Sequence, residues 1–127
     1  MTVRDEIFAR LSSGSTTLAA LIGTRVYRTK LPQNPTLPAV TYWKVSGNRL
    51  HDLTGPTGQS DPRFQVSCWA RTSATAEDVA EAVRVRLDGW TSTGGVQVAE
   101  LVNETDLYDD EVEIYHVALD FVLMHDE

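Results

Sequence analysis

Cysteine is nearly absent from this chain of 127 residues, in which Cys68 stands alone. A single cysteine cannot form an intramolecular disulfide bond, and its place in an alternating apolar pattern predicts a small buried side chain. Long apolar runs are absent as well, because no stretch approaches the roughly 18 consecutive apolar residues of a membrane-spanning helix. We therefore expect a reducing compartment and no association with a membrane.

Metal-binding and cofactor-binding motifs are also missing. The three histidines, His51, His116 and His125, have neither a second histidine at helical spacing nor a cysteine pair, so a zinc site would need ligands from distant segments. The glycines of TGPTG at residues 54–58 lack the lysine of a phosphate-binding loop. We expect no metal and no cofactor.

No catalytic pair is evident either. Ser67 and Cys68 are potential nucleophiles, but no base is encoded near them, and nucleophilic catalysis needs one within hydrogen-bond reach. We predict that the chain is not an enzyme. The alternative from another functional class is a small α+β enzyme or regulatory subunit whose active site is completed by a partner.

Basic residues are absent from residues 100–127, which carry ten of the 18 acidic residues. Residues 1–99 carry all eleven Lys and Arg residues against eight acidic ones, a balance of +3. This acidic excess disfavours sequence-independent DNA binding, which requires clustered cations. It suits contact with a basic protein surface, including a head-to-tail contact between copies. The alternative is that the acidic residues simply maintain solubility.

The remaining composition is typical of one compact domain spanning residues 1–127. Hydrophobic residues make up 42% and charged residues 23%, values close to those of ordinary globular chains, and a chain of this length can bury one core. Charges interrupt the first eleven residues, unlike the apolar centre of a secretory signal. We therefore expect the protein to fold in the cytoplasm.

Hydrophobic periodicity predicts both helices and strands. The predicted helices are residues 3–12, a short turn at about residues 18–22, and residues 75–88. The predicted strands are residues 25–30, 39–46, 63–70, 96–101 and 112–124. The strand at 63–70 alternates apolar and polar residues, and we expect it to pair with the last strand.

These elements predict an α+β fold with a four- to five-stranded antiparallel or mixed sheet and helices packed on one face. Residues 47–61 are dominated by turn residues and are predicted to form a long loop between two strands. Such a long connection is usually either functional or disordered.

Four segments, in this order and at this spacing, are similar to those of a known family. They are RVY at 25–27, LPQ at 31–33 with LP again at 37–38, QVSCWA at 65–70 and YHVALDF at 115–121. Together they cover nearly the whole chain and resemble the tail-completion proteins of long-tailed bacteriophages, the family that includes tail terminators and head-to-tail joining proteins.

The resemblance implies a small α+β subunit without catalytic residues, in a homo-oligomeric, six-membered ring at the head-proximal end of the tail. Such a ring caps the tail tube protein and docks to a head connector or stopper protein, while genomic DNA passes through the lumen without sequence-specific binding. The protein would then lie in the tail or neck of the virion after assembly in the host cytoplasm. The alternative is a capsid-side neck protein, an adaptor or stopper.

A ring subunit needs two unlike edges, and the uneven charge provides them. We expect a basic edge in the first part of the chain to meet an acidic edge in the last part of a neighbour. Trp69 lies on the mixed face of its strand, where a neighbouring subunit would cover it if no helix of the same chain does. The predicted interface residues are Arg25, Arg28, Lys30, Trp69, Asp106, Asp109, Asp110 and Glu111.

The long loop is the second predicted contact. We expect it to be mobile in the free subunit and to become ordered on docking to the tail tube or the connector. The predicted docking residues are Asn48, Arg49, Leu50, His51, Asp52, Leu53 and Thr54.

Overall fold

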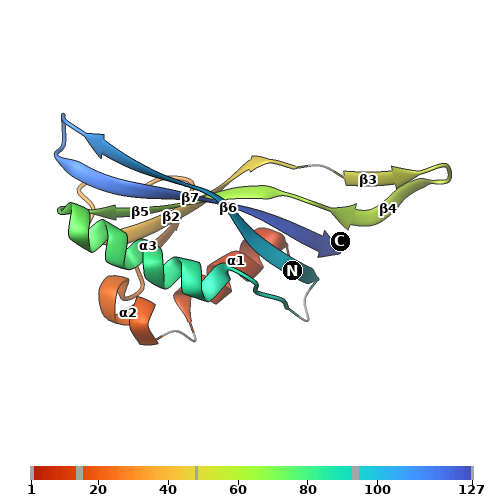
Figure 1. The fold of residues 1–127 in the computed structure, drawn as a ribbon, viewed down its shortest axis with the longest axis horizontal. Helices are drawn as coiled ribbons and strands as arrows, with labels where there is room; N and C mark the ends of the chain where they lie inside the picture. The colour runs from red at the N-terminus through yellow and green to blue at the C-terminus, as the bar shows by residue number, and fades with distance from the viewer. Residues whose placement is uncertain (1, 14–15, 48, 93–94, 127) are drawn as a thin grey trace.

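The computed structural model describes residues 2–13, 16–47, 49–92 and 95–126. These residues form, in order, α1 (Val3–Ser12), α2 (Thr16–Ile22), β1 (Val26–Arg28), β2 (Ala39–Ser46), β3 (Arg49–Asp52), β4 (Gly55–Ser60), β5 (Arg63–Ala70), α3 (Ser73–Leu87), β6 (Val96–Asp109) and β7 (Ile114–Asp126). The strands belong to one sheet, and the helices lie on one side of it (Figure 1). The predicted α+β class is confirmed.

The body of the sheet has the strand order β1-β2-β5-β7, with β6 on the far side of β7. β1 runs parallel to β2, whereas the other strand pairs are antiparallel, so the sheet is mixed. β3 and β4 continue β2 and β5 beyond the body, and β4 also pairs with the end of β7. β1 and β6 are therefore the two opposite edges of the body.

The core lies between the sheet and the helices. On β5, the apolar residues of the alternating pattern are fully buried, and each stands opposite an apolar or aromatic residue of β7. The pairs are Phe64 with Phe121, Val66 with Leu119, Cys68 with Val117 and Ala70 with Tyr115. The predicted pairing of residues 63–70 with the last strand is confirmed.

Helix α3 covers β5 and β7 because its apolar side chains recur every three or four residues. Its buried residues are Ala76, Val79, Ala80, Ala82, Val83 and Leu87. The helix begins at Ser73, two residues before the predicted start, because the Thr72 hydroxyl caps it by accepting a hydrogen bond from the Thr75 amide at 3.1 Å. None of the described helices is long and apolar enough to cross a membrane.

The prediction of a long loop at residues 47–61 is wrong. β3 and β4 form a hairpin, with Arg49 opposite Ser60 and Asp52 opposite Gly55. This hairpin, residues 49–60, projects beyond the helices and is called the arm below (Figure 1). No other layer covers the two faces of the arm, and a hairpin of this kind needs no apolar face. Its sequence therefore lacks the alternating pattern that marks a half-buried strand.

The arm also accounts for the seven strands, against the four or five predicted. Two further boundaries differ: β1 is shorter than predicted, since Thr29 has a φ of 74° and leaves the strand, whereas β6 continues through the acidic segment to Asp109. β6 thereby becomes one of the two longest strands and carries its acidic residues along a sheet edge.

Candidate interaction surfaces

The basic residues predicted to form an edge at β1 differ in their exposure to solvent. Arg28 and Lys30 are exposed. The Arg25 guanidinium turns inward instead: its Nε donates to the Pro38 carbonyl at 2.8 Å and its Nη2 to the Leu21 carbonyl at 3.3 Å. These bonds hold α2 against the segment that precedes β2, so the geometry gives Arg25 a structural role and leaves Arg28 and Lys30 facing solvent.

The acidic edge lies on the opposite side of the sheet. Within the described chain, residues 102–111 are all exposed, including Asp106, Asp109, Asp110 and Glu111. The first half of β6 is paired on its outer side by the segment after α3, because the Gly89 amide donates to Ala99 at 2.7 Å. Beyond residue 101, the described residues of β6 pair with β7. The outer backbone edge is therefore open where the acidic residues gather, and charge on such an edge discourages uncontrolled strand addition.

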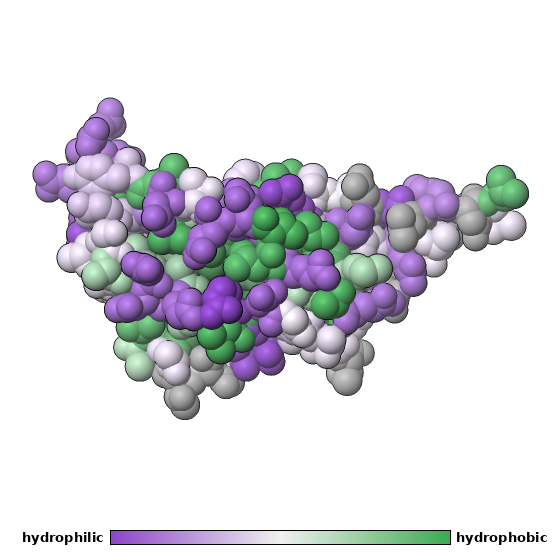
Figure 2. Space-filling view, viewed as in Figure 1, coloured by the Kyte–Doolittle hydropathy of each residue, from purple (hydrophilic) through white to green (hydrophobic). Residues whose placement is uncertain are grey.

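The turn that joins β6 to β7 has a defined shape. The Glu111 amide donates to Asp109 Oδ1 at 3.0 Å, Glu113 adopts a φ of 53°, and the rings of Tyr108 and Tyr115 lie 4.5 Å apart at its base. The turn lies at the end of the molecule opposite the arm (Figure 1), and Figure 2 shows a hydrophilic surface there. Its carboxylates are thus presented to solvent on an ordered hairpin.

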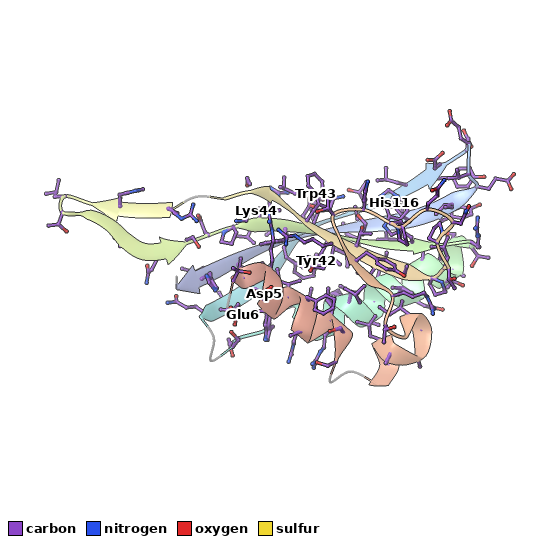
Figure 3. All side chains as sticks on the ribbon, turned by 180° about the vertical axis from the view of Figure 1, so that it is seen from behind. Asp5, Glu6, Tyr42, Trp43, Lys44 and His116 are labelled. Atoms are coloured by element: carbon purple, nitrogen blue, oxygen red, sulfur yellow. The ribbon has the colours of Figure 1, made fainter. Side chains whose placement is uncertain are left out.

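Trp69 lies on the sheet face turned away from the helices. Its ring stacks on His116 at 4.0 Å between centroids, and its indole N–H donates to the Thr41 hydroxyl at 2.9 Å. Burial lowers the pKa of His116, and Asp109 acts in the opposite direction. Figure 3 shows His116 and Trp43 on the side of the sheet opposite Tyr42, Glu6 and α1.

Exposed apolar side chains occur on this same outer face. The exposed fractions are 38% for Trp43, 44% for Val45 and 45% for Met124. Trp43 and Trp69 are therefore surface or half-buried residues, whereas Trp90 is a core residue at 8%.

The arm carries most of the predicted docking residues. Asn48 lies outside the described residues. The backbone of Arg49, Leu50, His51 and Asp52 forms β3, and Leu53 and Thr54 form the turn at the tip. Leu53 is fully exposed at 107% of its reference area, and Figure 2 shows hydrophobic surface at the tip of the arm. An apolar tip on a projecting hairpin has the shape of a docking element.

A buried polar cluster was not predicted. Glu6 and His125 are 5% and 6% exposed, with Glu6 Oε2 and His125 Nε2 2.9 Å apart, and the Ser92 hydroxyl donates to Glu6 Oε1 at 2.5 Å. The cluster joins α1, the end of β7 and the segment after α3. Its one sequence signal is the place of Glu6 beside Val3 and Ile7 on the apolar side of the first helix.

The described residues contain no group of three His, Cys, Asp or Glu side chains that could hold a metal ion. Cys68 is fully buried, and burial raises the pKa of its thiol. The protonated thiol is a poor nucleophile, so Cys68 acts as a small core residue, as predicted from its strand position.

Comparison with known proteins identifies the family. Residues 5–126 match the family described as "Tail completion protein gp17". A chain from a structure titled "Virion of native gene transfer agent (GTA) particle" has the same fold, with a TM-score of 0.78 and 22% identity over 95% of this chain and 92% of that one. No curated protein matches the sequence. Because the family match covers almost its whole length, the chain belongs to the tail completion protein gp17 family and is a structural protein of the phage tail.

Proposed function

We propose that this chain, as a single domain, is the subunit of a closed ring of six identical copies that completes the head-proximal end of the tail. The observation that carries this proposal is the placement of unlike charge on opposite sheet edges, with Arg28 in β1, Lys30 just after it, and the exposed acidic residues at β6. Two unlike edges favour a head-to-tail contact, which closes into a ring when the rotation between copies permits it.

The outer face of the sheet supplies a second contact. The half-buried Trp69 and the exposed Trp43, Val45 and Met124 lie on a face that the helices leave uncovered. A neighbouring subunit or another virion protein would bury these side chains, and aromatic residues are enriched at such contacts.

The arm is proposed to dock the ring to the tail tube or to a head connector or stopper protein. It projects beyond the helices and carries an exposed leucine at its tip. Genomic DNA passes through the lumen without being read, since an acidic surface repels phosphate and prevents retention. The proposal includes no catalytic step and no cofactor.

Mass and shape measurements test the ring. Light scattering coupled to size-exclusion chromatography should give the mass of six copies, either for the chain alone or after addition of tail tubes, and negative-stain images should show rings with a central hole. A chain that stays monomeric or dimeric at every concentration, with and without tail tubes, contradicts the proposal.

A further inference from the structure

A cavity of about 590 Å³ opens at the root of the arm, where α1, β1 and β2 meet. Its described lining includes the basic residues Arg4, Arg28, Lys44 and Arg49 and the acidic residue Asp5. The volume lies within the range of roughly 300–1,000 Å³ that is typical of ligand pockets. The cavity is therefore large enough to admit several side chains and is predominantly cationic.

One of these cations, Arg4, stands where folding alone does not favour it, and a second, Lys44, lies over an aromatic ring. Arg4 lies in the first turn of α1, where the helix dipole disfavours positive charge. Lys44 stands opposite Phe64 on the helix-facing side of β2, two positions after the buried Tyr42, with its ammonium 6.0 Å from the centre of the Phe64 ring. Figure 3 shows Lys44 on the strand and Asp5 at the start of α1, on the same side of the molecule.

The acidic lining residue does not cancel this charge. The Asp5 carboxylate accepts a hydrogen bond from the Thr2 amide at 3.2 Å, as part of the capping box of α1. This bond, with a smaller contribution from Arg28, lowers the pKa of Asp5. One ionised carboxylate against Arg4, Arg28 and Lys44 leaves the cavity with an excess of positive charge.

We propose that this cavity binds carboxylates of the acidic turn, residues 106–113, of a second copy of the chain. The turn carries Asp106, Asp109, Asp110, Glu111 and Glu113, all exposed, and no basic residue occurs anywhere in residues 100–127. Arginine side chains bind carboxylates through paired hydrogen bonds, which gives such a contact a defined geometry.

The position of the two surfaces makes this contact one between copies. The acidic turn and the arm lie at opposite ends of the long axis (Figure 1). The residues that line the cavity lie at the root of the arm. The turn of one copy therefore meets the cavity of the next, and the contact repeats from copy to copy. The inference rests on the proposed ring and specifies which residues join its subunits.

Two charge-reversal variants test the inference. The cavity variant carries Arg4→Glu and Arg28→Glu, and the turn variant carries Asp109→Lys, Asp110→Lys and Glu111→Lys, which leaves the turn with three basic and two acidic residues. A glutamate in the first turn of α1 suits the helix dipole, so the cavity variant should keep its fold, as checked by circular dichroism. Sedimentation velocity at low ionic strength should show self-association of the wild type, and each variant alone should associate at least about tenfold more weakly.

A one-to-one mixture of the two variants is the decisive sample. The acidic cavity of one variant then faces the basic turn of the other, while the second contact keeps its original charges, so the mixture should regain wild-type association. The matched controls are Arg84→Glu, which lies on α3 outside the cavity and the β1 edge, and Glu77→Lys with Asp78→Lys on α3, and both should associate like the wild type.

The outcomes separate this inference from the proposed function. Oligomers that persist in the cavity variant, or a mixture that regains no association, overturn the cavity assignment and leave the ring in place. A wild-type chain that does not self-associate, either alone or with tail tubes, overturns both. Binding of a short DNA duplex by the wild type that is lost in the cavity variant, with self-association unchanged, assigns the cavity to phosphate and overturns the inference.

Discussion

The long hairpin that runs from β2 to β5 has two halves of opposite character. In the half within the body, alternate residues such as Val40, Val66 and Phe64 are completely buried beneath the helices. In the arm, Arg49, His51 and Leu53 are exposed, and its strands pair with each other and, through β4, with the last residues of β7. The two halves share one type of backbone ladder, so the difference lies in what covers the side chains.

This difference assigns separate physical roles to the two halves. Burial of apolar surface in the body supplies most of the free energy of folding. The arm buries little such surface and should open locally at a lower free-energy cost than the body. We expect the body to determine whether the subunit folds and the arm to determine what it binds.

Truncation of Phe64 should have the largest effect on stability. Phe64 is fully buried on β5 opposite Phe121, and Phe64→Ala should lower the free energy of unfolding by about 3–5 kcal/mol because it removes a large buried side chain and leaves a cavity. Urea denaturation followed by circular dichroism measures this change. The matched variant in the arm, Leu53→Ala, should stay within about 0.5 kcal/mol of the wild type. Equal losses for the two variants would remove the distinction between the halves.

Removal of the buried carboxylate should have the next largest effect. Glu6→Ala removes the carboxylate that His125 Nε2 contacts and that accepts the Ser92 hydroxyl hydrogen bond, and we expect a loss of about 1–3 kcal/mol from unsatisfied buried groups. Thermal denaturation measures the loss. Glu77→Ala, on the exposed side of α3, is the control. A Glu6→Ala variant as stable as the wild type would show that the buried polar cluster does not stabilise the fold.

Loss of the α3 cap should cost less. Thr72→Ala removes the hydroxyl that accepts the Thr75 amide, which typically costs about 1 kcal/mol. Thr91→Ala, at an exposed position outside the helices, should change stability by less than about 0.5 kcal/mol. If the two threonine variants unfold at the same urea concentration, the Thr72 cap does not stabilise the layer of helices that covers the sheet.

Replacement of the arm should have the smallest effect on folding and a complete effect on docking. Arg49 and Ser60 face each other in the ladder, so an Asn-Gly turn in place of residues 50–59 should close the hairpin without strain. We expect the free energy of unfolding of the shortened chain, measured by urea denaturation, to lie within about 1 kcal/mol of the wild-type value. The shortened chain should lose head-to-tail joining in an in vitro assembly assay. Retained joining would show that the arm is not the docking element.

The elements of the body were predictable because each has a buried face. The bounds of residues 39–46 and 63–70 agree with β2 and β5 to the residue. In β5, burial on one face imposes a period of two, whereas β2 is marked by its β-branched and aromatic residues. The arm was missed because no layer covers it, and its Gly and Pro residues then resemble those of a loop. For the same reason, the apolar start of β6 was easier to predict than its continuation into the acidic segment, whose side chains are exposed.

The candidate interfaces were predictable in charge but not in geometry. Arg28 and the acidic residues of β6 are exposed as expected, but Arg25 bonds to two carbonyls of its own chain. Arg4 and Lys44, which line the cavity with Arg28, were not predicted, because they come from separate elements that only the folded sheet brings together.

The amino-acid order is sufficient to establish the α+β class, the core residues of β5, β7 and α3, and the separation of basic from acidic residues along the chain, because local periodicity and composition report burial and charge directly. The position of the basic and acidic segments on opposite sheet edges, the projecting arm and the contact of Glu6 with His125 across 119 residues depend on strand order and packing. These are long-range properties, and the energies that select them come from contacts between segments that no local pattern records.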